Sequence, residues 1–188
     1  MKTKMRTHSN IRTALSLLIL CLVSALAPAA HAELPPAAQA KVDKYKKLLS
    51  EWAKDPVIVA AVKEANGSDG IPGMTNAKWD ALVETDAAVT AVQTNPAGQL
   101  VTKLEADTGI NKLYLRDGKG NIIAASNKPL LYSIANRPAM TVMATSQPWA
   151  QGEVKPDPTT QIKSVQLAVP VMDHGKPIGV LHTGVTIE

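Results

Sequence analysis

The chain has 188 residues, with 20 Lys and Arg against 16 Asp and Glu and a formal net charge of +4. Residues 1–32 hold four of the basic residues and none of the acidic ones, so residues 33–188 carry 16 of each. This balance argues against nucleic acid as a partner, because nucleic-acid binding needs a surplus of basic residues. Cys21 is the only cysteine, which excludes disulfides and thiolate metal sites from residues 33–188.

Residues 1–32 have the pattern of a secretory signal peptide. A basic start is followed by an apolar run, which ends in the small-residue sequence Ala30-His31-Ala32. We expect cleavage after Ala32 and a periplasmic location. The alternative is a retained membrane anchor, because the uncharged stretch over 13–32 is barely long enough to span a bilayer.

Residues 33–109 are expected to form the helical part of a single domain. Apolar residues at positions 42, 45, 48, 49 and 52 recur at spacings of three and four, which is typical of an amphipathic helix. Asp55-Pro56 and Asn95-Pro96 each place a capping residue before a proline, a common helix start. We expect further helices after Pro56, from Thr75 onward, and up to Gly109.

The hydrophobic period changes to two after Gly109. Leu113 and Leu115 alternate with Tyr114 and Arg116, which predicts a strand with Tyr114 and Arg116 on one face. A turn over 117–121 and a strand over 122–126 complete a hairpin. A second hairpin is predicted from about residue 161 to residue 187, with its turn at 173–176.

The segment between the hairpins, residues 127–160, is irregular and rich in proline, and is called the crossing loop below. A loop of this length in a compact domain is usually functional or disordered. Helices followed by antiparallel hairpins predict an α+β fold, with residues 110–188 forming the sheet and the crossing loop.

Several stretches of the sequence resemble one family. The first hairpin contains LYLRD (113–117) and GNIIAASN (120–127), and the closing hairpin contains VQLAVPVMDHGKPIGVLHTGV (165–185). These stretches resemble Cache domains, which are extracytoplasmic PAS-like sensor modules. DPVIVAAV (55–62) and KWD (78–80) are similar to the lead-in of a subgroup of exported single-Cache proteins.

The resemblance implies long N-terminal helices packed on a PAS-like antiparallel sheet of about five strands. It also implies a small ligand, of the amino acid, carboxylate or amine class, held between the sheet and the crossing loop without a cofactor. Many relatives continue into a transmembrane helix and signalling domains, whereas this sequence ends at Glu188. We therefore expect the protein to pass its signal to a membrane receptor. A homodimer through the N-terminal helix is a further hypothesis.

The crossing loop departs from the family pattern. The subgroup has an acidic segment after the strand that ends at Ser126, whereas this chain has no acidic residue until Glu153. Two hypotheses remain open. The protein is a sensor with altered ligand chemistry, or it is a non-catalytic interaction module with a degenerate pocket that binds a partner protein or a second copy.

The ligand-binding candidates are few. Arg116 and Arg137 are the only arginines in residues 33–188, and a guanidinium is suited to bidentate capture of a carboxylate. Arg137 lies in the crossing loop and is the candidate, whereas Arg116 adjoins a turn and favours a structural role. Tyr132 and Trp149 are candidate pocket walls, because rings in a polar, proline-rich segment have no periodic reason to be there.

Two more residues complete the predicted binding set. Tyr114 shares a strand face with Arg116 and is a candidate for the pocket floor. The resemblance implies that Asp157 could be the acid that such domains use for an amine, and the alternative is an ordinary loop carboxylate. His174 and His182 lack metal-ligand spacing, and no nucleophile motif is present in the sequence, so we expect neither a metal site nor catalysis.

Overall fold

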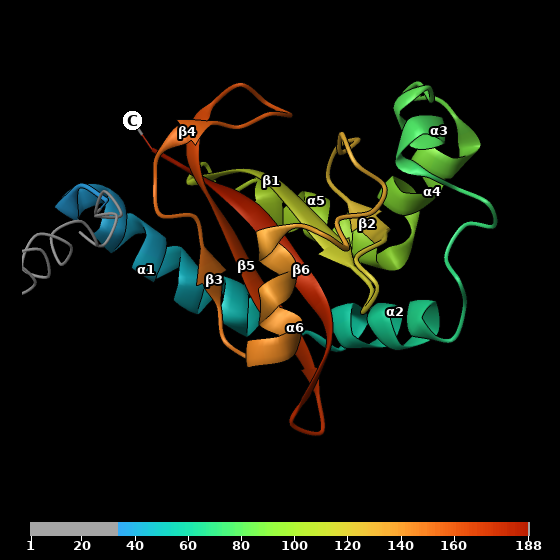
Figure 1. The fold of residues 1–188 in the computed structure, drawn as a ribbon, viewed down its shortest axis with the longest axis horizontal. Coiled ribbons are helices and arrows are strands. Elements are labelled where there is room, and N and C mark those ends of the chain that lie inside the picture. The colour runs from blue at the N-terminus through green and yellow to red at the C-terminus, as the bar shows by residue number, and fades with distance from the viewer. Residues whose placement is uncertain (1–33, 188) are drawn as a thin grey trace, which may run out of the picture. The chain divides into compact units, whose positions relative to one another are not determined.

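The computed structural model describes residues 34–187, and the predicted signal peptide lies outside the described residues. Among residues 34–187, no helix has the length and apolar character needed to cross a membrane. Helices over residues 36–105 precede a single antiparallel sheet, which confirms the predicted α+β fold (Figure 1).

Local sequence signals set the helix boundaries. Asp55 and Asn95 act as the expected caps, since their side chains accept hydrogen bonds from the amides of Val57 and Gly98 at 2.8 and 2.7 Å. The helix expected from Thr75 is interrupted over residues 81–86. The helices are α1 (Pro36–Trp52), α2 (Pro56–Asn66), α3 (Asn76–Asp80), α4 (Ala87–Thr94), α5 (Pro96–Glu105) and α6 (Val142–Thr145), with a 3₁₀ helix η1 (Pro138–Thr141).

The interruption after α3 has a local cause. The carboxylate of Asp86 accepts a hydrogen bond from the amide of Val83 at 2.6 Å, which stabilises a turn in place of a further helical turn. Asp86 then precedes α4, which starts at the next residue. A short Asp side chain that bonds to a nearby backbone amide favours such a break over a continuous helix.

The sheet contains six strands in the described residues, where the resemblance implied about five. The additional pairing comes from the crossing loop, where two strands of two residues each pair with β5. The main order is β2-β1-β6-β5-β3, with β4 also on β5, and all pairs are antiparallel. The strands are β1 (Ile110–Arg116), β2 (Ile122–Ala125), β3 (Trp149–Ala150), β4 (Lys155–Pro156), β5 (Lys163–Asp173) and β6 (Lys176–Thr186).

The residues of the turn between β5 and β6 suit its backbone conformation. His174 and Gly175 both have positive φ, at 46° and 78°. A two-residue turn with both φ values positive is the type that fits the twist of a hairpin, and glycine adopts it at little cost. The turn therefore fixes the register of the two longest strands.

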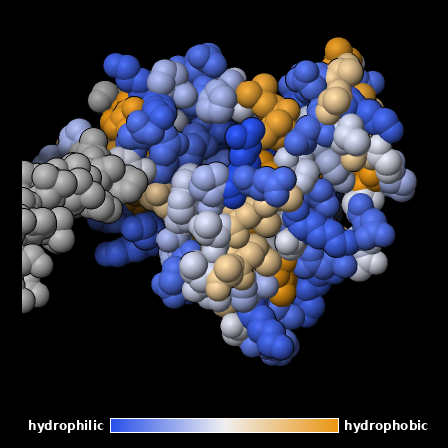
Figure 2. All heavy atoms as spheres, in the orientation of Figure 1, coloured by the Kyte–Doolittle hydropathy of each residue, from blue (hydrophilic) through white to orange (hydrophobic). Residues whose placement is uncertain are grey.

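The sheet has two different faces. Alternate residues of β1, β5 and β6, such as Leu115, Leu167 and Leu181, pack against α1, α2 and α5 in the main core. The opposite face is covered by the crossing loop, with α6 in front of the sheet in Figure 1. Most of the surface seen from this side is hydrophilic, and apolar residues gather in a few patches (Figure 2).

Helix α1 supplies one side of the main core. Val42, Tyr45 and Leu49 lie on one face of α1, and Val42 and Leu49 are fully buried. Tyr45 also donates a hydrogen bond of 2.5 Å to the Asp107 carboxylate, beyond α5. Burial and this acidic partner raise the pKa of Tyr45 to about 12, so the phenol stays protonated at neutral pH.

Truncation of Val42 tests this packing. Val42→Ala removes two methyl groups from a fully buried site, and we expect the free energy of unfolding to fall by about 2 kcal/mol. The matched control is Val83→Ala, at a side chain that is 61% exposed, which should stay within about 0.5 kcal/mol of wild type. Urea unfolding measures both, and an equal loss in the two variants would contradict the assigned core.

Candidate functional site

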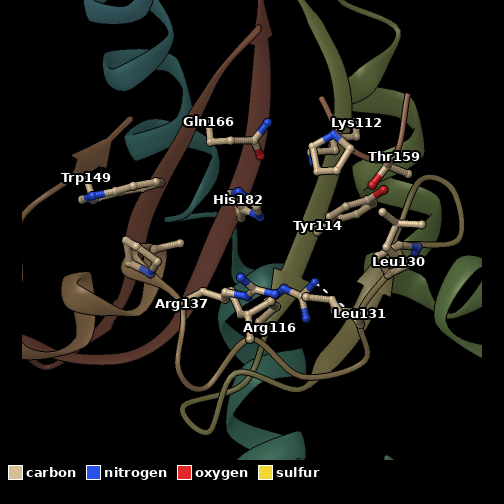
Figure 3. Close-up of a pocket in the computed structure, with 15 residues that line it drawn as sticks. Lys112, Tyr114, Arg116, Leu130, Leu131, Arg137, Trp149, Thr159, Gln166 and His182 are labelled. Atoms are coloured by element: carbon tan, nitrogen blue, oxygen red, sulfur yellow. Dashed lines mark hydrogen bonds between the residues drawn. The ribbon is translucent and has the colours of Figure 1, made fainter. Parts of the chain in front are cut away.

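A cavity of about 400 Å³ lies between the sheet and the crossing loop, and is called the sheet cavity below. Its position is the one that the resemblance implied for a ligand. The close-up in Figure 3 shows side chains from the strands and from the crossing loop converging on it. The lining residues are Lys112, Tyr114, Arg116, Pro129, Leu130, Leu131, Ile134, Arg137, Pro138, Ala139, Trp149, Pro158, Thr159, Gln166 and His182.

The floor of the sheet cavity comes from three adjacent strands. Lys112, Tyr114 and Arg116 line it from β1, because side chains two residues apart share a strand face. Tyr114 pairs with His182 of β6, and the two rings lie 6.4 Å apart between centroids. Gln166 adds an amide from β5. The alternating pattern of β1 therefore places a polar row on the face that the crossing loop covers.

Arg116 is a buried cation in this floor. Its side chain donates hydrogen bonds to the carbonyl oxygens of Gly120, Leu131 and Tyr132, at 3.1, 3.2 and 2.9 Å. Its Nε is buried and has no hydrogen-bond partner among the described residues. Burial lowers the pKa of Arg116 to about 10, so the guanidinium is still charged at neutral pH. Arg116 forms no ion pair with any residue in 34–187.

A buried ion pair lies at another part of the floor. The Lys112 ammonium is 2.6 Å from the Asp157 carboxylate, and the two side chains are 3% and 0% exposed. Burial alone would raise the pKa of Asp157, but the charge and hydrogen bond of Lys112 outweigh it and hold that pKa below its usual value. Asp157 is therefore ionised at neutral pH, and its charge is neutralised by Lys112.

His182 lies at the centre of the floor and is partly accessible through the sheet cavity. Its Nδ1 is buried and has no hydrogen-bond partner in the described part of the chain. Burial, followed by the charges of Lys112 and Arg116, lowers the pKa of His182 well below its usual value. The imidazole is neutral at pH 7 and offers the cavity an uncharged polar atom.

The walls are mostly apolar. Trp149 of β3 is half-buried, and in Figure 3 it stands across the cavity from Tyr114. Leu130 and Arg137 are exposed, which places both at the rim. In Figure 3 Arg137 lies at the same end of the cavity as Arg116. The site thus combines apolar walls with a guanidinium at the entrance and another in the floor.

The charge of the site is one-sided. Lys112, Arg116 and Arg137 are basic, and none of the described lining residues is acidic. Asp157 does not line the cavity, and it compensates only Lys112. The cavity therefore holds a surplus of positive charge in partly dehydrated surroundings, which favours an anion.

The structure brings together some of the five predicted ligand-binding residues. Tyr114, Arg137 and Trp149 line the sheet cavity. Asp157 does not line it but pairs with Lys112, and the side chain of Tyr132 packs instead against Trp79, with ring centroids 5.7 Å apart. The Tyr132 hydroxyl accepts a hydrogen bond from the amide of Ile71 at 2.8 Å. The contact of Tyr132 with the site is made by its carbonyl, which holds Arg116.

The floor of the site holds four residues that were not among the sequence candidates: Lys112, Arg116, Gln166 and His182. Arg116 was expected to be structural, and the other three were not assigned to the site. The period-two pattern of β1 is a signal that places Lys112 on the same face as Tyr114. No comparable signal marked His182, because its contact with β1 depends on strand pairing. Within residues 34–187 no group of three or more His, Cys, Asp and Glu could hold a metal ion.

The lowered pKa of His182 predicts a pH dependence of stability. Its folded-state pKa lies below the unfolded value near 6.5, so the unfolded chain binds more protons as the pH falls through 6.5. We expect the free energy of unfolding to decrease below about pH 6.5, by at most about 1.4 kcal/mol per pH unit from this group. His182→Asn should flatten this dependence between pH 7 and pH 5.5 in urea titrations. The control His174→Asn, at an exposed turn, should keep the wild-type slope, and equal slopes in both variants would contradict the assignment.

No protein-family model and no curated protein sequence matches the chain. Among solved structures, the chain is similar to the sensor domain of the histidine kinase DctB from V. cholerae, with 20% identity and a TM-score of 0.53. The match covers 79% of this chain and 50% of that one, so the chain spans about half the length of its relative.

Two chemoreceptor domains match less well. The ligand-binding domain of Pseudomonas fluorescens CtaA, in complex with L-alanine, has 18% identity and a TM-score of 0.40, with 80% of this chain and 56% of that chain covered. The ligand-binding domain of Campylobacter jejuni Tlp3, in complex with L-norvaline, has 13% identity and a TM-score of 0.42, with 81% and 63% covered. The fold assignment rests on the DctB domain. The described part of the chain has the fold of a Cache-type extracytoplasmic sensor domain, as the resemblance predicted.

Proposed function

We propose that the protein is an exported sensor domain that binds a small organic anion, of the carboxylate class, in the sheet cavity. The observation that carries this proposal is the cationic lining of the cavity, which includes Arg116 and Arg137 and no acidic residue among the described lining side chains. A volume of about 400 Å³ suits a small metabolite. The apolar walls would contact the body of the ligand, and the guanidinium groups its carboxylate.

The electrostatics of Arg116 support an anionic ligand. Its charge is buried, it has no acidic partner among the described residues, and its Nε lacks a hydrogen-bond partner there. An unpaired buried charge is costly, and a ligand carboxylate would reduce that cost through a charge-assisted hydrogen bond. A bound anion would therefore lower the free-energy cost of the buried Arg116 charge.

The predicted binding residues divide into two roles in this proposal. Tyr114, Arg137 and Trp149 would contact the ligand, because they line the sheet cavity. Tyr132 and Asp157 would act indirectly, Tyr132 by holding Arg116 through its carbonyl and Asp157 by holding Lys112. The alternative hypothesis of a filled, degenerate pocket is less favoured, because the cavity is open and its charge is unbalanced.

We also propose how the protein is exported and how it passes on its signal. Residues 1–32 would direct export and be removed, residues 33–109 would form the helical support, and residues 110–188 the sheet with the crossing loop. The ligand-bound domain would then be recognised by a membrane receptor, since a bound anion and the crossing loop together form an altered surface. This part rests on the signal-peptide pattern and on the resemblance.

Loss of Arg137 tests the ligand class. A thermal-shift screen of small carboxylates should raise the melting temperature of the wild type, because binding to the native state alone stabilises it. Arg137→Ala should weaken binding about 10- to 100-fold, the value of a charge-assisted hydrogen bond, while the ligand-free protein melts as before because Arg137 is exposed. Calorimetric titration gives the affinities.

Lys47→Ala is the control for charge, because Lys47 is exposed on α1, which packs on the other face of the sheet. This variant should bind as the wild type does. Absence of any carboxylate hit, or equal affinities for wild type and Arg137→Ala, would contradict the proposed ligand class.

Export has its own test. When the full chain is expressed with a C-terminal tag in a bacterial host, we expect the tagged protein in the periplasmic fraction with Glu33 as its first residue. Intact-mass measurement gives the start of the chain. A mass that retains residues 1–32 in the membrane fraction would favour the anchor instead.

A further inference from the structure

We propose that Lys112 serves as a built-in ammonium group for Asp157 and thereby restricts the sheet cavity to carboxylates that lack an α-amino group. This inference rests on the proposed function, because it concerns the ligand class of the same site. Lys112 is thus assigned as a specificity-determining residue. Lys112 pairs with Asp157, the acidic residue to which the ammonium group of an amino acid would otherwise bind.

The acceptor positions of Asp157 are fully used within the chain. Its Oδ1 accepts from the amides of Thr159 and Thr160 at 2.8 and 3.1 Å. Its Oδ2 accepts hydrogen bonds from Lys112 Nζ and from the side-chain amide Nε2 of Gln166, each at 2.6 Å. A carboxylate offers about four lone-pair positions, and four donors already fill them. No acceptor position is left for the ammonium group of a ligand.

Packing also keeps Asp157 away from the ligand. Its side chain is fully buried and does not line the sheet cavity. A Cβ at Gly184 would lie 3.0 Å from Asp157 Oδ2 and 2.4 Å from Asn111 Oδ1, so Asp157 lies close to the backbone of β6. The glycine at position 184 allows this approach. Asp157 is therefore held against the sheet by Lys112 and Gln166 and is reached only by displacing them.

The remaining polar groups of the cavity favour the carboxylate end of a ligand. Arg116 and Arg137 are cationic, and Lys112 lies 5.5 Å from the centre of the Tyr114 ring that forms part of the floor. A ligand ammonium would meet the uncompensated charges of Arg116 and Arg137 and no free carboxylate among the described lining residues. Electrostatic repulsion and an unmet hydrogen-bonding need would both act against it.

Matched ligand pairs test this inference on the wild-type protein. Each pair differs only in the α-ammonium group: propanoate and L-alanine, 4-methylpentanoate and L-leucine, 3-phenylpropanoate and L-phenylalanine. Thermal shift and calorimetric titration at pH 7 should detect at least one of the carboxylates, with its amino acid bound at least about tenfold more weakly. An amino acid that binds as tightly as its partner overturns the role of Lys112 and leaves the proposed carboxylate site intact. If no member of any pair binds, the proposed function itself fails, and this inference fails with it.

Chemical rescue tests the same inference without a carboxylate ligand. Lys112→Ala leaves Asp157 without its ammonium partner and opens space for a small amine. We expect the variant to melt at a lower temperature than the wild type, and ethylammonium chloride to raise its melting temperature relative to equal sodium chloride. The wild type and the double variant Lys112→Ala/Asp157→Asn should show no such specific effect, because one lacks the space and the other the charge.

Folded Lys112→Ala that does not respond to ethylammonium overturns the inference. Lys112→Met retains the side-chain volume and separates loss of charge from loss of packing. It should be destabilised but should not respond to the amine, because the methionine fills the space. A response of Lys112→Met equal to that of Lys112→Ala would likewise overturn it, since the amine would then act elsewhere.

Discussion

The sheet cavity depends on the hydrogen bonds of Arg116 to the crossing loop and to the turn between β1 and β2. One guanidinium holds the carbonyls of Gly120, Leu131 and Tyr132, and so fixes the start of the crossing loop over the sheet. A charged donor makes stronger hydrogen bonds than a neutral one, and buried carbonyls without partners would be costly. The same group that supports the loop thus brings a positive charge into the floor.

The charges around this cation are arranged in two parts. At one part Lys112 and Asp157 neutralise each other, and burial makes the pair costly to separate, because either partner alone would be an uncompensated buried charge. At the other part Arg116 and Arg137 have no acidic counterpart among the described residues that line the cavity. The neutral His182 lies on the floor that both parts share. An anion with an apolar body is the ligand that complements this arrangement.

Several elements of the fold followed from local patterns. The caps at Asp55 and Asn95 start α2 and α5, and the alternation of Leu113 to Arg116 predicted both β1 and the shared face of Tyr114 and Arg116. These features depend on residues within a few positions of one another. The break after α3 was missed, since the hydrogen bond of Asp86 to Val83 competes with a helical pattern that looked continuous.

The sequence by itself determined the α+β class, the two hairpins, and the position of the crossing loop between them, because turn residues and hydrophobic period are local signals. Only the tertiary structure decided that Tyr132 packs against Trp79 and that Asp157 forms an ion pair with Lys112. It also decided that His182 lies beside Tyr114. These contacts join segments far apart in the chain. They depend on strand register and on the path of the crossing loop, which no local pattern specifies.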